Sequence, residues 1–249
     1  MSISVSALMR AFATTAVALA LAACATQPAG TGQTAEDEVN DPLETVNRGV
    51  FQFNEGVDTV VLRPAAQAYR AVLPSFVQDS VQTLVRTVSA PVVLANDLLQ
   101  GNGEAAAQTG SRFLVNVALG LGVFDVASSA GIPYHAEDFG QTLAVWGAGE
   151  GPYLVLPFFG PSNARDAGGR VVDTLADPFR AVAVNGGAAP ALYYGSYGAG
   201  VVDQRARLLD ATEDLKRNSL DYYATVRSLY GQNRRNQITN GQTNPADTP

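Results

Sequence analysis

The chain has 249 residues, of which 47% are hydrophobic and only 16% are charged, and its formal net charge is −7. The length permits one well-buried domain or two small ones, and low charge combined with high hydrophobicity argues against disorder and for burial or lipid contact. The negative balance argues against a nucleic-acid partner, which needs clustered Lys and Arg, and the single cysteine excludes an intramolecular disulfide.

The amino terminus has the pattern of an export signal. Arg10 precedes an apolar segment, residues 11–23, which has the length of a signal sequence but is shorter than the roughly 20 residues that span a bilayer. The segment ends Leu-Ala-Ala-Cys at Cys24, which resembles a bacterial lipobox. The alternative is an ordinary secretory signal with an accidental cysteine, but Cys24 is the only cysteine, which favours lipid attachment. We predict a signal peptide over residues 1–23 and an acylated, flexible tether over residues 24–40.

The next hundred residues predict short amphipathic helices punctuated by proline. Asp41 is the expected N-cap of a first helix, whose apolar residues recur at steps of three and four until Arg63-Pro64 breaks it. A short helix then stops before Pro74. A helix from Ser75 is expected to end at Pro91, and another follows over residues 91–100, closed by Gly101.

Residues 104–119 predict a further helix with Phe113, Leu114 and Val117 facing inward, and residues 125–129 add a turn.

A central stretch between Asp138 and Arg165 carries one charge, Glu150, and the only tryptophan, Trp146. Glycine and proline interrupt it too often for a long helix, so its backbone must bend while it stays out of water. In a bilayer, bent backbone persists only if other protein covers it or if it faces a wet cavity. The alternative is a loop crossing the core of a globular domain. Prolines at 152 and 157 leave little room for a strand over residues 153–159.

The last third again predicts helices. Ser162 or Asn163 caps one that ends near Pro178, and Pro190 opens a long helix that becomes polar over residues 203–217. Ser219 restarts a helix that reaches Tyr230. We predict an all-α domain over residues 41–231 and a disordered polar tail over residues 232–249, in which the pair Arg234-Arg235 is solvated.

No motif indicates catalysis or a metal site. There is no P-loop, Tyr194-Gly195-Ser196-Tyr197-Gly198 lacks the first glycine of a nucleophile elbow, and one histidine argues against a triad or a His-based metal cluster. His135, beside Glu137 and Asp138, is expected to be solvated or locally hydrogen-bonded. The sequence therefore predicts a protein that is not an enzyme and uses no cofactor or metal.

Several separate motifs resemble, in order, those of the VacJ/MlaA family of Gram-negative outer-membrane lipoproteins. They are Asp41-Pro42-Leu43-Glu44-x-x-Asn47-Arg48-x-x-Phe51-x-Phe53-Asn54, Leu98-Leu99-Gln100-Gly101, Arg112-Phe113-x-x-Asn116, Asp125-Val126-Ala127, Phe139-Gly140-Gln141-Thr142-Leu143, Gly147-x-Gly149-x-Gly151-Pro152-Tyr153, Arg165-Asp166-x-Gly168-Gly169 and Arg207-Leu208-Leu209-Asp210. The resemblance covers roughly residues 41–230.

The resemblance implies a ring of helices set in the periplasmic leaflet of the outer membrane around an amphipathic channel. It implies removal of misplaced phospholipids from the outer leaflet and their transfer to a soluble periplasmic carrier, beside trimeric porins and without covalent chemistry. The candidate channel or lipid-contact residues are Asn47, Arg48, Phe51, Asn54, Gln141, Thr142, Trp146, Tyr153, Arg165 and Asp166. For the polar members, the alternative role is a helix cap, a buried hydrogen bond or an internal ion pair.

Two other functions stay open at this point. One is an envelope scaffold lipoprotein that positions porins or other partners without moving lipid. The other is an envelope phospholipase, which the single histidine and the missing nucleophile elbow disfavour.

Overall fold

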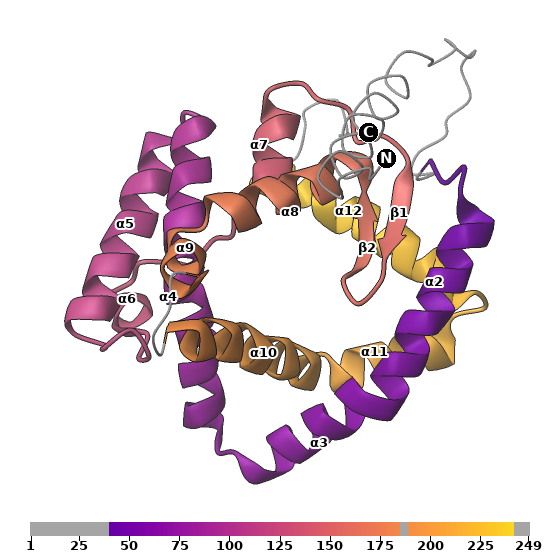
Figure 1. Ribbon diagram of the computed structural model, residues 1–249, viewed down its shortest axis with the longest axis horizontal. Helices are drawn as coiled ribbons and strands as arrows, with labels where there is room; N and C mark the ends of the chain where they lie inside the picture. Colours follow the sequence, from indigo (N-terminus) through magenta and orange to yellow (C-terminus); the bar gives the residue numbers. More distant parts are fainter. Residues whose placement is uncertain (1–39, 185–188, 242–249) are drawn as a thin grey trace, which may run out of the picture.

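The computed structural model describes residues 40–184 and 189–241, in which helices form a closed ring with one two-stranded hairpin in its wall (Figure 1). The predicted all-α class is thus confirmed, with the hairpin as an addition. The signal peptide, Cys24, the tether up to residue 39 and residues 242–249 lie outside the described residues. The elements before the hairpin are α2 (Glu44–Val57), η2 (Asp58–Leu62), α3 (Arg63–Val72), α4 (Ser75–Leu99), α5 (Gly103–Ala118), α6 (Val126–Ser129) and α7 (Phe139–Val145). The hairpin and the elements after it are β1 (Tyr153–Leu156), β2 (Gly160–Asn163), α8 (Ala164–Ala176), α9 (Pro178–Val184), α10 (Ala189–Arg207), α11 (Leu209–Asn218) and α12 (Tyr222–Ile238).

Of the prolines expected to end a helix, Pro74 does so, since α3 ends at Val72, but Pro64 and Pro91 do not. Before Pro64 the chain makes one π-helical turn, η2, and continues directly as α3, so that Pro64 lies in the first turn of α3 without ending the helical path. Pro91 lies inside α4, which runs unbroken for 25 residues. Since α4 packs against α5, α7 and α10, tertiary contacts hold it across the one lost hydrogen bond.

Asp41 is not the N-cap of the first helix. Helix α2 begins after Leu43 and has no side-chain cap. The Asp41 carboxylate instead accepts hydrogen bonds from Asn47, at 2.7 Å, and from Tyr223 and Arg227 of α12. The amino-terminal motif therefore joins the first described helix to the last.

The burial of α5 differs from the expected one, although Phe113 is partly buried and lines a small pocket beside α4. Leu114 and Val117, predicted to face inward, are 67% and 44% exposed, whereas Arg112 and Asn116 are buried. The reason is that α5 packs its polar face against α4 and the following loop through hydrogen bonds to Asp125 and the backbone. Large apolar side chains are likewise exposed in α3, α8 and α9 and in the loop after α5. Within the described ranges, no helix has both the length and the apolar character that a membrane crossing requires.

The hairpin is antiparallel and pairs Tyr153 with Asn163. Its turn adopts positive φ at Phe158 (66°) and Gly160 (77°), and points toward the middle of the ring (Figure 1). Two asparagines of α2 hold β1. Asn47 donates to the Tyr153 carbonyl and accepts from the Val155 N–H, while Asn54 makes the same kind of pair with Leu156 and Phe158. These side chains supply the partners that a two-stranded sheet lacks on its outer edge.

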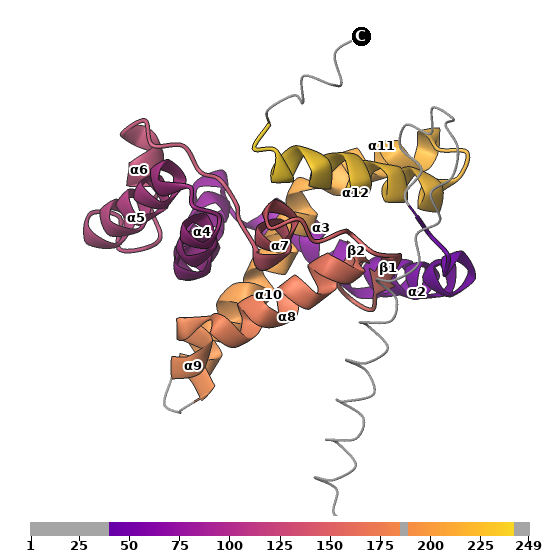
Figure 2. The same cartoon turned by 90° about the horizontal axis from the view of Figure 1, so that it is seen from above.

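Helices α11 and α12 lie together on one face of the ring (Figure 2). Helix α12 starts at Tyr222, capped by Asp221, and ends only at Ile238, so residues 232–238, assigned to the disordered tail, are helical. Arg234 is buried rather than solvated. Its guanidinium pairs with the carboxylates of Asp138 and Asp166. The polar sequence around Arg234 has no periodicity that predicts this burial.

Candidate functional site: a polar cavity in the ring

A cavity of about 470 Å³ opens between α8, α10 and α12. Every side chain that lines it carries a polar group. The lining residues are Asp138, Ser162, Asp166, Arg170, Asp173, Gln204, Tyr230, Asn233, Arg234 and Gln237. A polar space of this size, enclosed by a ring whose apolar side chains are exposed elsewhere, is the reverse of a water-soluble globule, in which apolar side chains fill the interior.

An ion-pair network closes one side of this cavity. The Arg234 guanidinium donates to both Asp138 oxygens, at 2.7 and 2.6 Å, and its Nε lies 2.7 Å from Asp166 Oδ2. Burial raises the pKa of Asp138, but the hydrogen bonds and charge of Arg234 outweigh burial and hold that pKa below its ordinary value. The network ties α12 to the N-termini of α7 and α8.

Local sequence fixes the position of Asp166. Asn163, one of the two predicted caps, caps α8 by accepting from the Asp166 N–H at 2.7 Å, and its side-chain amide donates to Asp166 Oδ2. The Tyr230 hydroxyl donates to the same oxygen, and this bond together with burial raises the pKa of Tyr230. Helices α7 and α8 approach closely at Gly169, which has no side chain. A Cβ at this position would lie 2.3 Å from the backbone nitrogen of Gly140.

Of the ten predicted site residues, only Asp166 lines the cavity. Arg165 pairs with Asp166 at 3.1 Å, the internal ion pair that was one alternative. Arg48 pairs with Glu44 and Asp221, and Phe51 packs against Tyr222 and Tyr223. With Asn47 and Asn54 they hold α2 against the hairpin and α12.

The remaining candidates also make internal contacts. Gln141 is buried, and Thr142, also buried, donates to Asn96 at 2.8 Å. Tyr153 is completely buried beneath Tyr223 and Tyr230. Trp146 is 55% exposed, and its indole N–H donates to the Leu99 carbonyl. Trp146 is thus the one aromatic candidate with an exposed ring.

The cavity residues that were not predicted come from four separate segments: Asp138, residues 162–173, Gln204 and residues 230–237. Arg170 and Asp173 of α8 are three residues apart, a spacing that places both on one helix face, whereas Gln204 and Arg234 stand in polar stretches. The spacing of Arg170 and Asp173 was the one sequence signal that could have predicted a charged helix face at the cavity.

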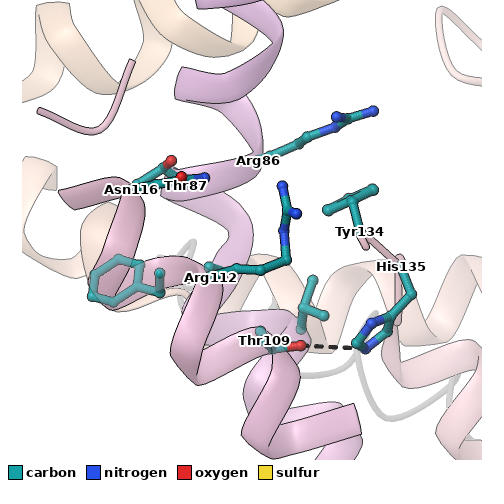
Figure 3. Close-up of a pocket in the computed structure, with 10 residues that line it drawn as sticks. Arg86, Thr87, Thr109, Arg112, Asn116, Tyr134 and His135 are labelled. Carbon is teal, nitrogen blue, oxygen red and sulfur yellow. Dashed lines mark hydrogen bonds between the residues drawn. The ribbon is translucent and has the colours of Figure 1, made fainter. Parts of the chain in front are cut away.

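A second, small pocket lies between α4, α5 and the loop before α7 (Figure 3). Its volume of about 20 Å³ suits a water molecule. The polar groups around it are largely committed: Arg112 pairs with Asp125 at 2.8 Å, and His135 bonds Asp97 and Thr109. His135 is thus hydrogen-bonded, although its partners lie far away in the sequence. We interpret this pocket as structural.

The fold and the cavity define the protein as a helical ring with a polar interior and exposed apolar side chains, and comparison with known proteins agrees. The sequence model of the family described as MlaA lipoprotein matches residues 39–237. The chain therefore belongs to the MlaA lipoprotein family.

Individual relatives support the assignment. The chain is 34% identical over 222 residues to the intermembrane phospholipid transport system lipoprotein MlaA of Escherichia coli, covering 84% of this chain and 83% of that protein. It is 36% identical over 206 residues to an uncharacterized protein of Rickettsia bellii, covering 79% and 76%. It also resembles a solved structure reported as the structural basis for maintenance of bacterial outer membrane lipid asymmetry, with a TM-score of 0.70, 33% identity, and coverage of 80% of this chain and 99% of that one.

Proposed function

We propose that the protein removes mislocalised phospholipids from the outer leaflet of the outer membrane through a passive path in the ring and passes them to a periplasmic carrier. It thereby maintains the lipid asymmetry of that membrane. Its relatives support this, since the Escherichia coli protein is named as a phospholipid transport lipoprotein. The protein is a lipid transport component, and the path needs no covalent chemistry.

One structural observation carries the proposal: a cavity in the ring is lined by polar groups, while large apolar side chains are exposed elsewhere, including Phe158 and Phe159 in the hairpin turn that points toward the middle of the ring. A phospholipid has the same division. Its charged headgroup is costly to bury without polar partners, whereas its tails tolerate apolar surface. A headgroup can therefore pass along the polar cavity while its tails remain among apolar side chains.

The proposal extends to location and partners. Acylation of Cys24 anchors the protein, and several acyl chains make membrane residence stable at about 0.8 kcal/mol per buried CH₂. The ring then lies in the periplasmic leaflet, beside porin trimers that expose their own apolar surface to lipid. The exposed side chains of α3, α8 and α9, among them Leu175 at 67%, support contact with lipid in this position.

Deletion of the gene tests the function. A deletion strain should accumulate phospholipid in the outer leaflet and become sensitive to detergent with chelator, and the wild-type gene should restore both traits. The Cys24→Ala form, which cannot be acylated, should fail to restore them. Wild-type levels of surface phospholipid in the deletion strain would contradict the proposal.

A pair of neighbouring substitutions separates transport from a scaffold role. Asn233→Trp places a bulky ring in the cavity, whereas Gln232→Trp changes the adjacent exposed residue of α12, which does not line the cavity. For a conduit, the first variant should fail to complement the deletion and the second should succeed. Complementation by both variants at equal protein level would favour the scaffold.

A further inference from the structure

The charges that line the cavity are not all paired within the described part of the protein. They comprise three carboxylates, Asp138, Asp166 and Asp173, and two guanidinium groups, Arg170 and Arg234. Arg234 pairs with Asp138 and Asp166. Among the described residues, Arg170 and Asp173 form no ion pair within 4.0 Å. Arg170 and Asp173, on the same cavity wall, thus have no ion-pair partner, although the charge of Arg234 still acts on Asp173 from a longer distance.

The Asp173 carboxylate accepts two hydrogen bonds and can accept more. Its Oδ1 accepts from the Asn96 side chain and its Oδ2 from the Phe139 N–H, each at 2.9 Å. A carboxylate offers about four lone-pair sites, so two remain. Burial raises the pKa of Asp173, and neither its two hydrogen bonds nor the charge of nearby Arg234 cancels that rise. A ligand cation at this point would supply what the protein does not.

Arg170 stands where polar and apolar surfaces meet. Its guanidinium lies 5.2 Å from the ring centroid of Phe159, in the turn of the hairpin. Phe158 and Phe159 of this turn are both more than half exposed, as are Val171 and Leu175, which belong to α8 like Arg170. An anion bound by Arg170 therefore has polar groups on one side and exposed apolar side chains on the other, as a lipid phosphate requires.

We propose that Arg170 and Asp173 bind the two opposite charges of a zwitterionic phospholipid headgroup, with the phosphate at Arg170 and a primary ammonium at Asp173. This rests on the proposed transport function and names its preferred substrate. Side chains at i and i+3 have Cβ atoms roughly 5–6 Å apart, a separation that suits the two charges of phosphoethanolamine. Phosphatidylglycerol has the phosphate but no ammonium, so it brings a net negative charge and leaves the Asp173 carboxylate without a partner. It should therefore bind less well.

Binding to the full-length protein in detergent micelles tests this preference. The ligands are phosphatidylethanolamine and phosphatidylglycerol with the same fluorescent label on one tail, followed by fluorescence anisotropy. One charge-assisted hydrogen bond predicts roughly tenfold tighter binding of phosphatidylethanolamine. Asp173→Asn should abolish that difference by weakening this lipid alone, and Arg170→Gln should weaken both lipids. Asp214→Asn and Arg217→Gln, which change an exposed ion pair on α11, should alter neither.

The outcomes separate this inference from the function on which it rests. Equal affinity of the wild-type protein for both lipids, a comparison that needs no variant, overturns the inference and leaves transport standing. Preference retained by a folded Asp173→Asn protein overturns it as well. Failure to bind either lipid overturns the inference and counts against transport. Free phosphoethanolamine should compete only weakly, and strong competition would indicate a site for a soluble molecule instead.

Discussion

Arg234→Gln should destabilise the fold more than any surface charge substitution, because this guanidinium joins α12 to two carboxylates. Removing one partner of a buried ion pair costs about 3–5 kcal/mol. The Arg234 side chain is 8% exposed and that of Asp166 is 9% exposed, whereas that of Asp138 keeps 41% and can be solvated when unpaired. Only Asp166 is left buried, and Arg165 still contacts it, so we expect the lower end of the range, about 3 kcal/mol.

The assay is urea unfolding of the full-length protein in detergent micelles, followed by far-ultraviolet circular dichroism. Arg217→Gln is the matched control: its ion pair with Asp214 is exposed, at 71% and 65%, and should contribute less than about 1 kcal/mol. If Arg234→Gln unfolds with a free energy within about 1 kcal/mol of the wild-type value, the ion-pair network does not hold the ring together as argued.

Three further changes test other contacts. His135→Gln should remove a pH dependence, because the hydrogen bond that His135 donates to the Asp97 carboxylate raises the pKa of His135 above 6.5. The contribution of protonated His135 to stability is therefore full below that pH and is lost as pH rises through the folded pKa. Urea midpoints at about pH 6 and pH 8 measure this, and equal slopes in variant and wild type would contradict it. Asn47→Ala should cost about 2 kcal/mol and speed amide exchange in β1, because two buried backbone groups lose their partner; unchanged exchange would refute that role. Gly169→Ala should cost about 1–3 kcal/mol in the same unfolding assay, whereas Gly168→Ala, whose new Cβ meets nothing within 4 Å, should not; equal effects would exclude the close helix contact.

Local signals predicted much of the helical structure. Asn163 caps a helix because its short side chain reaches the backbone N–H groups of the first turn, and Gly101 follows the end of a helix because glycine adopts positive φ easily. The structure confirms both positions. Predictions failed where tertiary contacts override local rules. Pro91 remains inside α4 because neighbouring helices hold it, and the apolar side chains of α5 are exposed because the ring buries hydrogen-bonded polar groups. A helical wheel shows an apolar face but does not say whether protein or lipid covers it.

The cavity was harder to predict than the fold. Its walls come from α8, α10 and α12, whose polar residues have no common motif and come together only when the ring closes. The sequence motifs that carry the family resemblance instead mark contacts that hold the ring, such as Asn47 with the hairpin and Arg48 with Asp221. Motif residues of this kind therefore mark the contacts that hold the ring together, and among the ten predicted site residues only Asp166 also lines the cavity.

The contact between Asp41 and α12 has a consequence for the order of events during biogenesis. The Asp41 side chain is only 1% exposed, and its partners Tyr223 and Arg227 are synthesised more than 180 residues later. Contacts this distant in sequence form slowly, because the entropy of closing the intervening loop must be overcome first. A nascent chain that lacks its final helix therefore displays its apolar residues as an open arc, so a holding chaperone should act before ring closure and be released by the arrival of the carboxyl-terminal segment.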